Sequence, residues 1–410
     1  MAPTLDLEFV RAHFPALADG WTIMENAGGT LVPTQVIDWL DGYLRRNQVQ
    51  PGAAFPASAE AETKIHEGQR AIAALIGADR SEVMIGPSTT MNVFLLSHAI
   101  RPWLKPGDEV IVTNLDHEAN NGAWRRLAEI GATIKEWRFD PDTCELAAEG
   151  LRALLTERTR LVCFTQCSNV VGVIHDVAAL TRVAHDAGAL VCVDAVAYAP
   201  HRALDVKALD VDFYLFSLYK LYGPHLAALY GKRELFQKAR ALNHFFIGEN
   251  DIPLKLNPGG VNHELTASLA GIGGYIDALH ERHFPRSNAD RRDRARQVFG
   301  LVADHEQALN AVVLDFLANH PKVRLNGSRD PSKATRVPTF TFTVPGRDAT
   351  EIPQALLNDR IGIRAGDFYA RRAIDAWGVG GRGGVVRASL VHYNTVEEAH
   401  RLVAALDRVL

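Results

Sequence analysis

The stretch RLVCFTQCSNVVGVIHDVAALTRVAHDAGALVCVD, residues 160–194, alternates strand-like and helix-like segments. Two short apolar runs, 161–165 and 189–193, flank a segment whose apolar side chains recur at helical spacing. That helix is expected over 176–187, and Gly188 follows it as a C-cap. A strand, a helix and a second strand in this order predict two parallel strands of one sheet.

Five more strand-like runs lie on either side of this stretch. They are EVMIG (82–86), DEVIVTN (108–114), ATIKEWRF (132–139), DFYLFS (212–217) and LAALYG (226–231). Helical patterns separate several of them, including one over 88–100 and one over 118–131. The strands are continuously apolar rather than alternating, which is typical of a sheet covered by helices on both faces. The sequence therefore predicts an α/β fold with a mostly parallel seven-stranded sheet.

The pattern changes after about residue 258. A long amphipathic helix is expected up to Pro321, and the run 335–344 alternates like an antiparallel strand with one open face. Another strand follows over 385–394, and a last helix begins at Thr395 with Glu398 completing a capping box. These elements predict a smaller α+β domain. The predicted limits are 21–284 for the large domain, and 1–20 with 285–410 for the small one.

Composition excludes several classes of function. The net charge is −4 without a basic stripe, which argues against nucleic-acid binding. The first residues do not resemble a signal peptide, and no apolar run approaches ~18 residues, so we expect a cytoplasmic protein without a membrane span. The spacing of the four cysteines fits neither a zinc site nor a disulfide framework, and no compact metal-binding motif is present, so no metal is expected.

Polar residues follow the predicted strands at their carboxyl ends, where open α/β sheets bind ligands. Taken singly, each has an ordinary structural explanation: helix capping, a hydrogen-bonded loop, or a lysine that extends to solvent. Their convergence on one edge of one sheet favours a binding site. The set comprises Ser88, Thr89, Thr90, Asp116, His117, Ser168, Asn169, Asp194, Ser217 and Lys220.

Lys220 lies in the largely apolar and aromatic stretch DFYLFSLYKLYGPH, residues 212–225. Burying its ammonium without a partner would be costly, which suggests that its nitrogen is bonded to a ligand. Pyridoxal 5′-phosphate meets this requirement, because its aldehyde condenses with a lysine amine. Its ring nitrogen needs a nearby carboxylate to stay protonated, and its phosphate suits the first N–H groups of a helix. The sequence therefore predicts a pyridoxal 5′-phosphate site.

The segment FSLYKLYGP (216–224) resembles the cofactor-lysine motif of the cysteine desulfurase and class V aminotransferase family, which belongs to the fold-type I pyridoxal-phosphate enzymes. The likeness extends over nearly the whole chain in ordered motifs. These are ENAGGTLVP (25–33), LDHEAN (115–120), QCSNVVGVIHDV (166–177), VDAVAYAPH (193–201) and VRASLVHYNT (386–395). The resemblance implies the fold-type I transferase fold, with its large sheet domain and smaller C-terminal domain.

The resemblance also assigns cofactor roles. It implies that Lys220 forms the imine and later moves protons at the substrate Cα. Asp194 would pair with the ring nitrogen, His117 would stack on the ring, and Asn169 would contact the ring hydroxyl. The phosphate would be held by Thr89, Thr90, Ser217 and Tyr219.

On the substrate side, the resemblance implies that Arg387 binds the carboxylate of an amino acid in a bidentate manner. Asn26 would lie in the segment that lines the substrate. Family members are homodimers with active sites at the interface, so Gly260, in NPGGVNHE (257–264), is expected to approach the phosphate of the other subunit.

One departure bears on the reaction. The segment RAGDFYA (364–370) resembles the desulfurase segment that carries the nucleophilic cysteine, but Tyr369 stands at the cysteine position. A tyrosine hydroxyl cannot accept sulfur as a persulfide. None of the four cysteines is expected within reach of the substrate.

Three functions remain open from the sequence. The first is a lyase that deprotonates Cα of a small amino acid or cysteine derivative and breaks a C–S bond by β-elimination, without a persulfide. The second is a class V aminotransferase or an amino-acid racemase. The third is a protein that holds pyridoxal phosphate, or binds a partner, without turnover.

Overall fold

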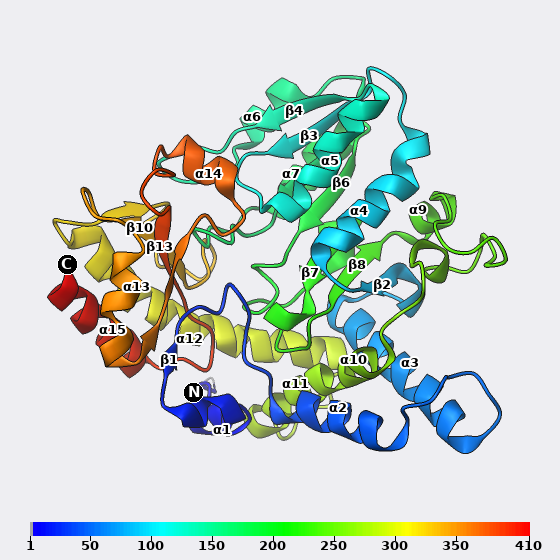
Figure 1. Cartoon of the computed structure of the whole chain (residues 1–410), viewed down its shortest axis with the longest axis horizontal. Coiled ribbons are helices and arrows are strands. Elements are labelled where there is room, and N and C mark those ends of the chain that lie inside the picture. The colour runs from blue at the N-terminus through cyan, green and yellow to red at the C-terminus, as the bar shows by residue number, and fades with distance from the viewer. Residues whose placement is uncertain (1–2) are drawn as a thin grey trace.

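The large sheet predicted from the strand pattern is present in the computed structural model, which describes residues 3–410. Its strand order is β2-β8-β7-β6-β5-β3-β4, and β8 alone runs in the direction opposite to the other six strands. The mostly parallel seven-stranded α/β fold is therefore confirmed (Figure 1). The strands are β2 (Val83–Gly86), β3 (Glu109–Thr113), β4 (Thr133–Trp137), β5 (Thr159–Thr165), β6 (Leu190–Asp194), β7 (Phe213–Ser217) and β8 (Ala227–Gly231).

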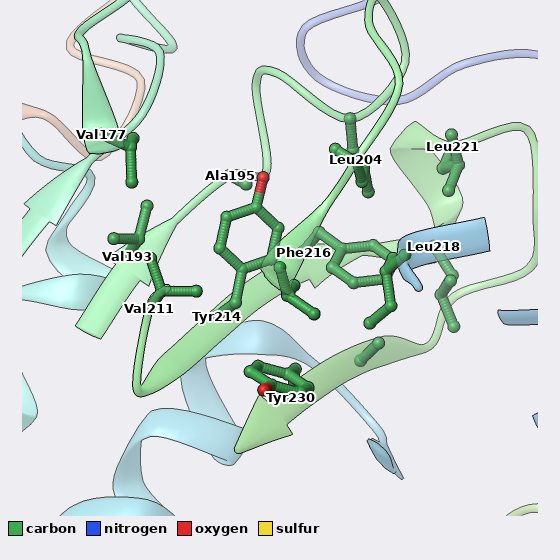
Figure 2. Packing of buried hydrophobic residues seen from close by; sticks show 14 of the residues in the cluster. Val177, Val193, Ala195, Leu204, Val211, Tyr214, Phe216, Leu218, Leu221 and Tyr230 are labelled. Atoms are coloured by element: carbon green, nitrogen blue, oxygen red, sulfur yellow. The ribbon is translucent and has the colours of Figure 1, made fainter. Parts of the chain in front are cut away.

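Each face of this sheet buries its own set of apolar side chains. On β7, Tyr214 and Phe216 point to one face, where Figure 2 shows them beside Tyr230 of β8. Phe213 and Leu215 alternate with them and belong to the cluster on the other face. The first face is covered by α3 (Pro56–Ile76), α7 (Val177–Asp186) and α11 (Ala270–His283), and the second by α4 (Thr89–Ile100), α5 (Gly122–Arg125) and α9 (Arg233–Lys238).

A second, antiparallel sheet lies in the C-terminal part (Figure 1). Its order is β12 (Arg364–Gly366), β13 (Val385–Ser389), β10 (Thr339–Thr343) and β9 (Arg324–Asn326). It packs with α12 (Arg291–Asn319) and α15 (Val396–Val409) around one apolar cluster. The capping box predicted for the last helix is present, since Thr395 and Glu398 exchange hydrogen bonds.

The prediction of an open face on β10 is wrong. Thr339 and Thr341, on the side opposite Phe340, are as buried as the phenylalanine itself. The reason is that this side packs on the loop after β5, where Val337 N–H donates to the carbonyl of Gly172 at 2.9 Å. The second sheet is thereby joined to the end of β5, where the polar residues of the first sheet gather.

The single helix expected over 118–131 is also wrong. The segment forms a short turn, then α5, then a 3-10 stretch over Arg126–Ile130. Asn120 donates its amide to Asp116, and Asn121 donates to the carbonyl of Thr113, so both side chains bond the end of β3 instead of leaving the helix free to form.

The long helix α12 spans both apolar clusters. Its first half packs Val298 into the cluster of the large sheet, and its second half packs Val313 into the cluster of the small sheet. The domain limits at 20/21 and 284/285 stay a prediction. The remaining elements are α1 (Leu7–Ala12), α2 (Thr34–Arg46), α6 (Ala148–Leu154), α8 (Val206–Leu209), α10 (His263–Ser268), α13 (Glu351–Ala355), α14 (Arg371–Ala376), and β1 (Thr22–Ile23), which pairs with β11 (Ile361–Gly362).

Between residues 3 and 410, no helix is both long and apolar enough to cross a membrane. Over the same range, no three His, Cys, Asp or Glu side chains gather in an arrangement that would hold a metal ion.

Candidate active site

The carboxyl ends of the central strands line a cavity of about 60 Å³. Thr165 at the end of β5 is the register partner of Asp194 at the end of β6, and Ser217 ends β7 beside Ala227 of β8. Most of the residues predicted for the cofactor line this one cavity. Its lining comprises Ser88, Thr89, Thr90, His117, Ala119, Thr165, Cys167, Asn169, Asp194, Val196, Ala197, Ser217, Tyr219 and Lys220.

Lys220 lies on the cavity wall in a 3-10 turn that follows β7. Its side chain makes no hydrogen bond with residues 3–410, and the residue is only 6% exposed. Burial lowers the pKa of the Lys220 amine to about 8, with the positive charge of Arg387 as the next cause. Thr30 holds this turn, because its N–H donates to the carbonyl of Tyr219 and its hydroxyl accepts from Tyr222 N–H. A lysine in this state is readily deprotonated for attack on a carbonyl.

Asp194 lies at the carboxyl end of β6, on the same cavity. Burial raises the pKa of its carboxyl group to about 6. Two groups lower this pKa in part: the N–H of Val196, which donates to Oδ1 at 2.8 Å, and the charge of Lys220. A cationic ring nitrogen would stabilise the ionised carboxylate. The geometry fits the predicted pairing of Asp194 with such a nitrogen.

His117 lies in the loop after β3 and is neutral in this structure. Burial lowers its pKa to about 3, and the charges of Lys220 and Arg387 lower it further. Its Nδ1 accepts the N–H of Ala119 at 3.0 Å, which places the ring proton on Nε2. The imidazole is thus held in one orientation as a flat, uncharged surface at the cavity.

An anion cradle forms where α4 begins. Ser88 caps this helix by accepting the N–H of Met91, and Ser88, Thr89 and Thr90 line the cavity, so the N-terminus of α4 lies at its wall. The hydroxyl groups of Thr89 and Ser217 lie 2.8 Å apart and join α4 to the end of β7. Hydroxyl groups beside a helix N-terminus are suited to a phosphate.

Arg387 lies on β13, two residues before the strand ends, and is 2% exposed. Its Nη2 donates to Oε1 of Glu25 at 2.6 Å, and its Nη1 donates to the carbonyl of Asn169 at 2.9 Å. The ring of Phe368 lies 3.8 Å from the guanidinium carbon. The side-chain amide of Asn169 donates to the carbonyl of Phe368 at 3.0 Å, so this group of residues connects the cavity wall to the small sheet.

Tyr369 is 72% exposed and follows Phe368 in the loop after β12. Both residues have positive φ angles, 53° and 57°, which is strained for side chains of this size. The carbonyl of Tyr369 accepts the N–H of Glu118 at 2.7 Å, and its ring centroid lies 5.3 Å from that of His117. Through Phe368 and Tyr369 the loop therefore contacts both Arg387 and His117, the residue that would stack on the cofactor.

Four residues with a predicted cofactor or substrate role do not line the cavity: Arg387 and Tyr369, described above, and Asn26 and Gly260. Asn26 is buried and bonded to Ile23, Ser389, Tyr393 and Asn394, so its side chain links the N-terminal segment to β13 and does not line the cavity. A place for it on the substrate side stays a prediction. Gly260 lies on a separate cavity near α3 and Asn257, and its predicted role needs a second subunit.

The sequence reasoning missed Glu25 and the contact of Phe368 with Arg387. Glu25 belongs to the quoted motif ENAGGTLVP, and a charged residue beside Asn26 was a signal that could have been followed. The sequence also placed all four cysteines out of reach, and this is wrong for Cys167, which lines the cavity. Burial raises the pKa of the Cys167 thiol to about 12, which makes it a poor nucleophile.

The residues present fit pyridoxal 5′-phosphate. The cavity brings together a buried amine that can be deprotonated, a buried carboxylate, a neutral imidazole, and hydroxyl groups beside a helix N-terminus. Lys220 would bond the aldehyde, Asp194 would face the ring nitrogen, and Thr89 with Ser217 would hold the phosphate.

Comparisons with known proteins agree with this fit. The sequence pattern described as aminotransferase class-V matches residues 22–281 and 295–402. The chain is 38% identical to the aminotransferase-like protein FGM3 of Gibberella zeae, over 99% of each chain. It is 34% identical to the cysteine desulfurase-like protein ustD of Aspergillus flavus, over 99% of this chain and 91% of the relative.

Among solved structures, the cysteine desulfurase CsdA of Escherichia coli is 27% identical and superimposes with a TM-score of 0.83 over 98% of each chain. Fold and sequence thus point to one group of enzymes. The chain is a pyridoxal-phosphate-dependent enzyme of the class-V aminotransferase family, similar to the cysteine desulfurases.

Proposed function

We propose that this enzyme removes the Cα proton of a small amino acid or cysteine derivative and eliminates a sulfur substituent from Cβ, without a persulfide. For an S-substituted cysteine, water enters and the products are the free thiol, pyruvate and ammonium. Pyridoxal 5′-phosphate supplies the aldehyde that captures the amino group and the cationic ring that takes up the electrons left at Cα.

The observation that carries this proposal is the contrast between one available amine and no available thiol. Lys220 lines the cavity with its pKa lowered to about 8, so about 10% of the free amine is unprotonated at pH 7 and can accept a proton, far more than for a solvated lysine. All four cysteines are buried, and Cys167, which lines the cavity, has a thiol whose pKa is raised by burial to about 12, so it carries almost no thiolate near neutral pH. Tyr369, at the position expected for a desulfurase nucleophile, presents a phenol instead of a thiol.

The side chains divide the work as follows. Arg387 binds the substrate carboxylate, since a buried guanidinium offers paired N–H donors. Lys220 accepts the proton from Cα and returns it to the sulfur group that leaves Cβ. His117 and the Phe368–Tyr369 loop exclude water from the side of the cavity that faces Arg387.

The test is a substrate panel with the loaded enzyme. S-Methyl-L-cysteine and L-cysteine are supplied in turn, and pyruvate, ammonium, thiol and sulfide are measured. Equal release of pyruvate and thiol supports elimination. Sulfur release with alanine as the product would overturn it, because alanine is what remains when a protein thiol takes the sulfur.

The alternative reactions share the proton transfer at Cα and are separated in the same assay. An aminotransferase would convert a second keto acid into an amino acid, and a racemase would invert L-alanine. Either result, without pyruvate from S-methyl-L-cysteine, contradicts elimination.

We also propose that the enzyme acts as a homodimer. Phe245 and Phe246 are 99% and 69% exposed at the tip of one loop, and solvent is an unfavourable place for two large aromatic side chains. A second subunit would cover them and could bring Gly260 to the phosphate. Light scattering during gel filtration tests this, and a monomer at micromolar concentration would refute it.

A further inference from the structure

The carboxylate of Glu25 is bonded to Arg387, the residue that the proposed function gives to the substrate carboxylate. Its Oε1 accepts from Nη2 of Arg387 at 2.6 Å, while Nη1 of the same arginine is used by the carbonyl of Asn169. Nε of Arg387 is buried and has no hydrogen-bond partner within residues 3–410. A bidentate carboxylate would use Nε together with Nη2, and Nη2 is the atom that Glu25 occupies.

The backbone around Glu25 holds this carboxylate in place. Glu25 forms a parallel bridge with Ser389 of β13, and Ala27 N–H donates to the hydroxyl of Ser389 at 2.8 Å. Because Ser389 lies two residues beyond Arg387 on the same strand, the ion pair links neighbouring backbones. The contact therefore follows from the fold of the N-terminal segment.

Gly28 provides the space for the Glu25 side chain. A Cβ at this position would lie 2.1 Å from Oε2 and 2.6 Å from Oε1 of Glu25. Its backbone is outside the left-handed region, so the absence of a side chain is explained by the carboxylate above it and not by the turn. Glycine and glutamate together form the internal partner of Arg387.

Glu25 also has a route away from Arg387. Its side chain is 26% exposed, whereas that of Arg387 is 3% exposed. Arg364 of β12 is the register partner of Arg387, so its side chain leaves the same face of the sheet. A displaced Glu25 carboxylate could thus move to a second, exposed arginine at little electrostatic cost.

We infer that Glu25 is an internal competitor for Arg387 that an amino-acid substrate must displace, and that it therefore sets substrate affinity. This inference rests on the proposed role of Arg387 as the receptor of the substrate carboxylate. It makes Glu25 a residue that determines affinity for carboxylates, in a region where only Asn26 was expected to act.

The test measures equilibrium binding to the loaded enzyme, by absorbance titration and calorimetry, with two probes. L-Alanine carries the carboxylate, and L-alaninamide has the same amine without it. Glu25→Gln is expected to bind L-alanine on the order of tenfold more tightly than the wild type, with little change for L-alaninamide. Unchanged or weaker binding of L-alanine to this variant would overturn the inference.

Two further variants keep the outcome decisive. Gly28→Ala expels the Glu25 carboxylate without removing its charge, so it should also tighten L-alanine binding. Glu136→Gln is the matched control: its ion pair with Arg125 has the same 2.6 Å separation and the glutamate is 28% exposed. This control should leave both affinities unchanged, and a gain there equal to that of Glu25→Gln would contradict a specific role of Glu25.

Arg387→Gln separates this inference from the proposed function. If that variant binds L-alanine as well as the wild type does, the carboxylate role of Arg387 fails, and the inference fails with it. If it binds more weakly while Glu25→Gln and Gly28→Ala show no gain, only the competition by Glu25 is refuted.

Discussion

Lys220, in the turn after β7, and Asp194, at the end of the neighbouring strand β6, line one cavity, and the attraction between them opposes the effect of burial on both groups. Burial lowers the pKa of the amine to about 8 and raises that of the carboxyl to about 6. Each group is thus brought closer to neutrality than it would be in water. A cofactor that bonds the amine and offers a cation to the carboxylate removes both costs of burial at once.

Replacement of Lys220 by Ala should abolish proton exchange at Cα, because the amine is the only group assigned to that transfer. Loss of a catalytic base typically costs 10²–10⁴-fold or more in rate. The measurement is exchange of the Cα hydrogen of L-alanine in deuterated water, followed by NMR. The visible absorption of the lysine-bound cofactor should disappear as well. Exchange at the wild-type rate would remove Lys220 from the mechanism.

The stability of the cofactor-free protein should depend on the charge of Lys220. Its pKa is about 8 in the folded chain and 10.5 in a solvated lysine, so the unfolded state binds more protons between these values. Stability therefore rises with pH across this window, by about 3 kcal/mol in all. Below pH 8 both states are protonated, and the full cost of burying the ammonium is present.

Lys220→Met should remove this rise while leaving other titrations in place. The free energy of unfolding of both proteins, measured in urea from pH 7 to 10.5, gives the difference directly. The methionine variant should be the more stable protein at pH 7, and the gap should close as pH increases. A gap that stays constant with pH would show that the buried amine is not the cause.

The cofactor side of the site could be predicted from sequence because parallel strands end at one edge. Asp194, Ser217 and His117 each follow an apolar run, and that position alone brings them together. The contact between Glu25 and Arg387 joins residues 362 positions apart and depends on how the first segment lies along β13. No periodicity in the sequence carries that information.

Other errors have the same origin in long-range contacts. Residues 118–131 have a helical pattern, but the side chains of Asn120 and Asn121 bond the end of β3. Distance along the chain predicts that Cys167 lies far from the substrate loop 364–370. Cys167 lies on the cavity because β5 ends beside β6, and the residues that follow β5, Cys167 and Asn169, line the cavity together with Asp194 at the end of β6.

Arg387→Gln should weaken the binding of L-alanine by roughly 10- to 100-fold, as expected for loss of a charge-assisted hydrogen-bonded pair. Cofactor affinity should change little, because Arg387 does not line the cavity between α4 and β7. Absorbance titrations with L-alanine and with the cofactor measure the two constants separately. An equal loss of both would argue that Arg387 supports the fold of the site and does not receive the substrate.

The folded, loaded enzyme should resist alkylation by iodoacetamide and keep its activity, in contrast to an enzyme that uses a cysteine nucleophile. All four cysteines are buried, and burial raises the pKa of Cys144 and Cys167 to about 12. The thiolate is the reactive form, so labelling near pH 8 requires unfolding. Mass spectrometry should find no label on the native protein and four labels after guanidinium treatment. A single native label that stops product release would identify a reactive cysteine and contradict elimination without a persulfide.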